Sequence, residues 1–214
     1  MNKFKLFAFL IASTIFSSCV SMSTLQTARV LGAGETQGAV AYSSVDSQLQ
    51  YNNIFGDDTS KVTNTGKGGL IEIQAIYGIN DKLDVNFKVG LLGTGSIGAK
   101  YQLLGDMETK GALSVGGSLG YLSVGDATFY DFTIPVYASY HPAEWLALYA
   151  SPKLIYRTNN LPEGSSIGSA MWYGSTVGTR IGNKFGLLLE YSFMNTKALS
   201  KSVGQFATGL SFSF

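Results

Sequence analysis

The chain has 214 residues, a formal net charge of +1, and only 14% charged residues. This charge content is low for a soluble protein, and nothing in the balance suggests nucleic acid as a partner. Aromatic residues make up 13% and glycine contributes 26 residues, yet no stretch after the first 18 residues approaches the roughly 18 apolar residues of a membrane helix. Length and composition therefore favour one β-barrel domain.

Residues 1–18 have the pattern of a secretory signal peptide. A short basic start precedes an apolar core, residues 6–16, that is too short to span a bilayer. Small residues then precede the only cysteine, Cys19, so the segment resembles lipoprotein signals, in which this cysteine is lipidated. An ordinary signal peptide that contains a cysteine is the alternative. The resemblance implies a lipidated linker, residues 19–35, outside a barrel of residues 36–214.

Apolar and polar residues alternate almost to the end of the chain, which is typical of strands with one apolar face. The clearest case is 83–91, in which Leu83, Val85 and Phe87 share one face and Asp84 and Lys88 the other. The pattern predicts about ten strands, with eight or twelve as alternatives. It is weakest in the first, eighth and ninth of these. The ten predicted strands are 37–45, 71–79, 83–91, 97–103, 113–121, 130–141, 146–157, 167–181, 186–194 and 206–214.

The predicted connections alternate in length. Tight turns rich in Gly, Asn, Asp and Pro alternate with longer loops, above all 46–67 and 159–166. The apolar faces also carry tyrosines at both strand ends, as expected where amphipathic rings meet two lipid–water interfaces. These tyrosines are Tyr77, Tyr101 and Tyr140 at the short-turn end, and Tyr121, Tyr130 and Tyr156 at the loop end.

The last predicted strand has an apolar face formed by Phe206, Leu210, Phe212 and Phe214, and the residues on its other face are small and polar. It resembles the closing strand of bacterial outer-membrane β-barrels, whose C-terminal phenylalanine is part of the signal read by the insertion machinery. The resemblance implies an all-β, antiparallel, up-and-down transmembrane barrel with both termini in the periplasm. Outer-membrane lipids and the barrel-insertion machinery are the partners it implies. A soluble lipocalin-like barrel is the alternative, but its outer face would carry many more Lys and Glu residues.

Charged residues fall on the face predicted to line the lumen, with four acidic and five basic side chains. A selective pore would more plausibly carry a ring of one sign, whereas mixed charges can pair and fill a narrow lumen. Glycines on the inward face partly favour an open lumen instead, because they leave space. The predicted lumen charges are Glu72, Asp84, Lys88, Lys100, Asp131, Lys153, Arg157, Arg180 and Glu190.

No motif identifies a catalytic residue, a metal site or a cofactor. Residues 93–98 match the dinucleotide fingerprint G-x-G-x-x-G, but a strand pattern follows where the fingerprint needs a helix, so we interpret them as a glycine hairpin. His141, the only histidine, lies at a predicted short turn without a recognisable Ser–His–Asp set. Asp57 and Asp58 are interpreted as a solvated loop rather than a cation site.

Two functions remain open. The first is a structural or surface-interaction barrel that uses the loop 46–67 as its contact surface, with a ligand that the sequence does not name. The second is a narrow channel for ions or small solutes. An outer-membrane enzyme of protease or lipid-modifying type is a remote alternative.

Overall fold

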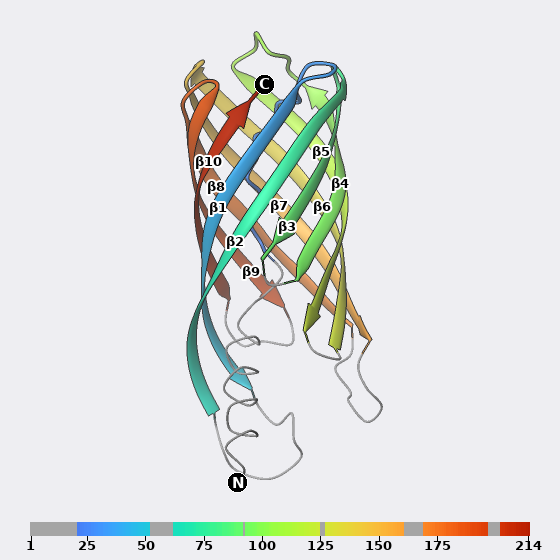
Figure 1. The fold of residues 1–214 in the computed structure, drawn as a ribbon, viewed down its shortest axis with the longest axis vertical. Helices are drawn as coiled ribbons and strands as arrows, with labels where there is room; N and C mark the ends of the chain where they lie inside the picture. Colours follow the sequence, from blue (N-terminus) through green and yellow to red (C-terminus); the bar gives the residue numbers. More distant parts are fainter. Residues whose placement is uncertain (1–20, 52–61, 92, 125–126, 161–168, 197–201) are drawn as a thin grey trace.

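The computed structural model describes residues 21–51, 62–91, 93–124, 127–160, 169–196 and 202–214. They form ten antiparallel strands in one closed barrel, which confirms the predicted fold class and strand number (Figure 1). No helix long and apolar enough to cross a membrane occurs in these residues. The strands are β1 (Thr36–Tyr51), β2 (Val62–Asn80), β3 (Leu83–Gly90), β4 (Thr94–Leu104), β5 (Gly111–Val124), β6 (Ala127–Ala143), β7 (Leu146–Asn160), β8 (Ala170–Ile181), β9 (Phe185–Thr196) and β10 (Val203–Ser213).

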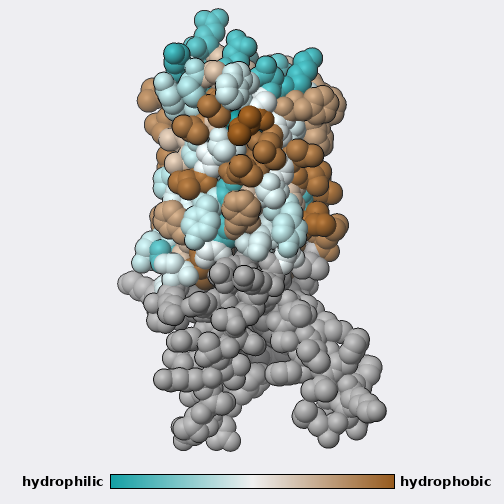
Figure 2. Space-filling view, turned by 90° about the vertical axis from the view of Figure 1, so that its left-hand side faces the viewer, coloured by the Kyte–Doolittle hydropathy of each residue, from teal (hydrophilic) through white to brown (hydrophobic). Residues whose placement is uncertain are grey.

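The alternation along each strand separates an apolar outer wall from a polar interior. In β3, Phe87 is 52% exposed on the outside while Asp84 is fully buried inside. Figure 2 shows apolar side chains over the outer wall and hydrophilic residues at the short-turn rim. The six tyrosines predicted for the two interfaces are all exposed, at 45–52%. An apolar belt with aromatic edges is the surface that a bilayer requires of a barrel.

The barrel closes where β1 meets β10. The two strands pair from Gln37 opposite Ser213 to Asp46 opposite Gly204. At the end of this seam the backbone N–H of Phe214 donates to the carbonyl of Thr36 at 2.9 Å. The chain therefore begins and ends its barrel at the same rim, next to the short turns (Figure 1).

At the loop end, β1 and β2 continue past the rest of the wall. In the described part, β1 pairs with β10 only as far as Asp46, and β2 pairs with β3 only as far as Glu72. The two strands pair with each other as far as Tyr51 and Val62. The predicted loop 46–67 is thus partly wrong, because most of its residues extend this hairpin; Asp57 and Asp58 lie outside the described residues.

Candidate functional site

The N-terminal residues of the described chain lie inside the barrel. Residues 21–31, here called the lumen segment, have no regular secondary structure, and side chains from all ten strands contact them. Such contacts on every side place the segment along the barrel axis. The contacting residues are Ala41 of β1, Glu72 of β2, Lys88 of β3, Lys100 of β4, Ser114 of β5, Ser139 of β6, Lys153 of β7, Thr176 of β8, Glu190 of β9 and Gln205 of β10.

This position differs from the linker outside the barrel that the sequence predicted. The physical reason is the apolar content of the segment, which is removed from water at three evenly spaced residues. Met22 packs in a cluster with Ile155, Met194 and Val203. Leu25 packs with Ala39, Ala41 and Leu188, and Ala28 packs with Ala112 and Tyr137.

Carboxylate and amide oxygens of the wall accept hydrogen bonds from the segment's backbone. The N–H groups of Thr24 and Leu25 donate to Glu190 at 2.8 and 2.6 Å. The N–H of Met22 donates to Gln205 Oε1 at 2.7 Å, and that of Val30 to Gln102 Oε1 at 2.7 Å. A buried chain without secondary structure needs such partners, because its polar groups have lost water.

Three wall lysines bind the carbonyl groups of the same segment. Lys153 Nζ donates to the Met22 carbonyl at 2.7 Å, and Lys88 Nζ donates to the Ser23 carbonyl at 2.9 Å. Lys100 Nζ bonds the carbonyls of residues 27 and 29 at 3.0 and 2.8 Å. The lumen charges therefore hold the segment through its backbone, a role that the sequence did not reveal.

A tight turn at the short-turn rim joins the segment to β1. Gly34 has a φ of +83°, and the N–H of Glu35 donates to the carbonyl of Gly32 at 3.0 Å. A Cβ at Gly78 would lie 2.2 Å from the Gly32 carbonyl oxygen, so this close approach requires glycine on β2. The segment thus starts in the loop-side half of the lumen, leaves it at the short-turn rim, and reverses into β1.

The nine predicted lumen charges all lie on the inner face, and six of them form ion pairs between neighbouring strands. Lys100 Nζ lies 3.2 Å from Asp84 Oδ2, and Lys88 Nζ lies 3.5 Å from Glu72 Oε1. Arg157 binds both oxygens of Asp131, at 2.7 and 2.8 Å. These pairs join one wall strand to another and do not include the segment.

The other three charges are held differently. Among the described residues, Glu190 and Lys153 form no salt bridge; the segment lies between them, and Glu190 also accepts from the Tyr149 hydroxyl at 2.7 Å. Arg180 lies at the short-turn rim, where it donates to the Gly182 carbonyl at 2.8 Å and to Ser211 Oγ at 3.0 Å.

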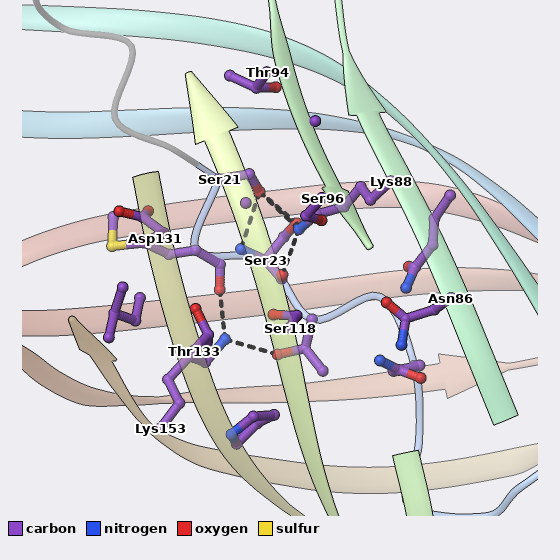
Figure 3. Close-up of a pocket in the computed structure, with 18 of the residues that line it drawn as sticks. Ser21, Ser23, Asn86, Lys88, Thr94, Ser96, Ser118, Asp131, Thr133 and Lys153 are labelled. Carbon is purple, nitrogen blue, oxygen red and sulfur yellow. Dashed lines mark hydrogen bonds between the residues drawn. The ribbon is translucent and has the colours of Figure 1, made fainter. Parts of the chain in front are cut away.

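A cavity of about 80 Å³ remains beside the segment, toward the wall of β2 to β7 (Figure 3). Most of the residues that line it carry a hydroxyl or an amide, including Ser21, Ser23, Asn86, Thr94, Ser96 and Ser118. Two buried amide oxygens at this cavity, Gln26 Oε1 and Gln74 Oε1, have no protein hydrogen-bond partner. A single water needs a cavity of at least roughly 10–15 Å³, so this cavity is large enough to hold water.

The features considered for enzyme activity form no catalytic set among the described residues. His141 Nε2 lies 3.0 Å from Ser139 Oγ, but the described residues give this imidazole no carboxylate partner, and Ser139 also accepts from the Ala28 N–H at 3.3 Å. Residues 94–98 belong to β4, which confirms the hairpin interpretation of the glycine motif. In the described ranges no group of three or more His, Cys, Asp or Glu could hold a metal ion.

The residues predicted as an insertion signal lie on the outer face of β10 and at the chain end. Phe206, Leu210 and Phe214 are 49%, 63% and 79% exposed. Phe212 is half-buried because its ring covers Gly38 of β1 and lies 5.7 Å from the ring of Phe214. Cys19, the predicted lipidation site, lies outside the described residues.

Comparisons with known proteins support the fold. No protein-family model and no curated protein matches the chain. Among solved structures, the COG4313 outer membrane channel from Pseudomonas putida F1 matches with a TM-score of 0.59 at 11% identity, over 91% of this chain and 100% of that one. The N-terminal β-barrel domain of Pseudomonas aeruginosa OprF (TM-score 0.39, 12% identity, 86% and 100% covered) and Ail of Yersinia pestis (0.37, 14%, 85% and 99%) are also similar. The chain has the fold of bacterial outer-membrane β-barrels.

Proposed function

We propose that this protein is an outer-membrane barrel that its own N-terminal segment keeps closed, and that it has a structural or surface-interaction role. The observation that carries the proposal is the lumen segment, which receives contacts from all ten strands. Paired wall charges fill further space around it. A lumen occupied in this way leaves no wide aqueous path.

In this proposal the short-turn end faces the periplasm and the loop end faces outward, as is usual for bacterial barrels. The β1–β2 hairpin, which extends past the wall, is then the surface-contact element. Outer-membrane lipids cover the apolar belt, and the insertion machinery reads the C-terminal strand. An epitope inserted between Tyr51 and Val62 should bind antibody on intact cells; binding only after the outer membrane is permeabilised would contradict this orientation.

Lipidation of Cys19 remains part of the proposal, and the structure adds a condition to it. Ser21 accepts a hydrogen bond from Lys88, six residues along β3 from the short-turn end. Two residues span at most about 7 Å. A lipid on Cys19 could therefore reach the membrane surface at the short-turn end only after the lumen segment has been withdrawn.

The test of the closed barrel is planar-bilayer recording of the purified full-length protein. We expect a baseline without sustained conductance, because the segment and the ion pairs occupy the lumen. Steady single-channel steps in every insertion would contradict the closed barrel. They would favour the second candidate, a permanently open narrow channel; the Pseudomonas putida protein of similar fold is an outer membrane channel.

A further inference from the structure

The wall of the lumen is largely electrostatically complete without the segment. The pairs Lys100–Asp84, Lys88–Glu72 and Arg157–Asp131 each join two wall strands. If the segment left, these six charges would keep their partners. A permanent structural plug would more plausibly supply the counter-charges that the wall needs.

The segment itself binds through exchangeable groups. Its polar contacts with the wall use backbone N–H and C=O groups, hydroxyls such as Ser23 Oγ, which donates to Glu72 at 2.9 Å, and the Gln26 side-chain amide, which donates to the Tyr137 hydroxyl at 3.2 Å. Its one charged side chain, Arg29, lies at the short-turn end, where it donates to the Thr109 carbonyl. Water can take over hydrogen bonds of this kind when the segment leaves and the lumen fills with water.

The segment also does not fill the cross-section of the barrel. Leu25 packs against β1 and β9, and Met22 packs against β7, β9 and β10, whereas the cavity lies beside the segment along β2 to β7. The lining there includes small residues, among them Ser96, Ser118 and Gly120. Figure 3 shows Ser23 of the segment and Ser118 of the wall among the residues that line the cavity.

The tether fixes the direction of any movement. The segment joins β1 at Thr36, which is paired with Phe214 at the short-turn rim. A shift toward the loop end would leave the chain still running through the barrel. Only withdrawal through the short-turn mouth removes it from the lumen.

We propose that the lumen segment is a removable plug, and that its withdrawal through the short-turn mouth opens a pore for small hydrophilic solutes. This inference rests on the proposed closed barrel and deepens it. The pore would be lined by hydroxyls, amides and paired charges, with four acidic and five basic side chains. Selection by size, with little preference for the sign of charge, follows from that lining.

The first test is single-channel recording of the full chain with Leu25→Asp. The Leu25 side chain is 2% exposed, and its backbone N–H already donates to Glu190 at 2.6 Å. A second carboxylate beside Glu190 should favour the withdrawn state by about a hundredfold or more, because burying an unpaired charge shifts the equilibrium between the docked and withdrawn states by at least that factor. Leu25→Met is the matched control, because it keeps the volume and adds no charge. Heat-dependent gel mobility verifies that each variant forms a barrel.

The second test locks the segment in place. Ala28 and Ala112 pack in one cluster, so Ala28→Cys with Ala112→Cys, added to the conducting Leu25→Asp variant in a Cys19→Ala background, places two small thiols close together. Mass spectrometry checks that the disulfide has formed. Oxidation should abolish channel openings and reduction should restore them. The same protein is its own control, so a folding defect cannot produce the difference.

The outcomes separate the two proposals. We expect wild type and Leu25→Met to be closed except for brief openings, Leu25→Asp to conduct steadily, and its reversal potential in a KCl gradient to lie near zero. Steady wild-type conductance equal to that of Leu25→Asp would overturn the closed barrel. A folded but silent Leu25→Asp beside a silent wild type, or equal currents in the oxidised and reduced double-cysteine protein, would overturn the plug alone. A reversal potential near the equilibrium potential of K⁺ or of Cl⁻ would contradict a pore that selects solutes by size and not by charge.

Discussion

Truncation of Leu25 to alanine should increase the fraction of molecules in which the lumen segment is withdrawn, and the packing of Leu25 gives the size of the increase. Leu25 is 2% exposed and lies in a cluster with Ala39, Ala41 and Leu188. Leucine-to-alanine changes at such sites cost about 2–5 kcal/mol, and a site next to a hydrated lumen falls toward the lower end. A loss of about 2–3 kcal/mol raises the withdrawn population roughly 30- to 150-fold.

The labelling rate of a buried thiol measures this population. Ser23 is 5% exposed in the segment, so Ser23→Cys in a Cys19→Ala background reports on withdrawal. A maleimide that does not cross membranes, added to the protein in nanodiscs, should react faster by the same factor when Leu25→Ala is introduced. Leu210→Ala, a matched truncation at a lipid-facing leucine that is 63% exposed, should leave the rate unchanged. Equal rates with and without Leu25→Ala would refute the reasoning that this contact holds the segment in the barrel.

Three further predictions concern the wall, the chain start and a turn. Lys100→Met removes the partner of the buried Asp84 and should lower the free energy of unfolding in lipid by about 3–5 kcal/mol. Lys82→Met, in an exposed turn, is the control and should change this free energy little. Equal effects of the two substitutions in urea titrations would contradict the buried pair. Cys19→Ala should abolish metabolic labelling with palmitate, and unchanged labelling would exclude lipidation there. Two backbone N–H groups of its own turn hold the pKa of Asp106 below the usual carboxyl value. This turn should therefore stay ordered above the ordinary carboxyl pKa and loosen as the pH falls through the lowered pKa of Asp106. A pKa of Asp106 at or above the ordinary carboxyl value, measured by NMR titration, would contradict this.

The barrel was predictable from the sequence because each wall strand has a lipid face and a lumen face. Period-two alternation therefore identified nearly every strand and the direction of its side chains. The first strand was weak for a reason now visible in the structure. Its inward residues Ala39 and Ala41 are small because Leu25 packs against them, so its two faces differ little in polarity. The inward Trp172 of β8 blurs that strand in the same way, since it packs against the cluster around Met22.

The lumen segment could not be predicted from strand patterns, because it forms no ladder. Wall side chains satisfy its backbone, and this arrangement leaves no periodicity of two in the segment itself. The available signal was the spacing of Met22, Leu25 and Ala28, three apolar residues at equal intervals in a stretch interpreted as a lipidated linker outside the barrel. The lumen charges were placed by parity, but their contacts with the segment's carbonyl groups required the fold.

The position of Leu25 inside the barrel tests the central claim most directly. A diazirine analogue of leucine, incorporated at position 25 of the full-length protein in lipid, cross-links to whatever lies against it on illumination. Peptide mapping should place the cross-links on Ala39, Ala41 and Leu188, which belong to β1 and β9. Cross-links to lipid, or none to these two strands, would show that residues 21–31 lie outside the lumen and would contradict the closed barrel.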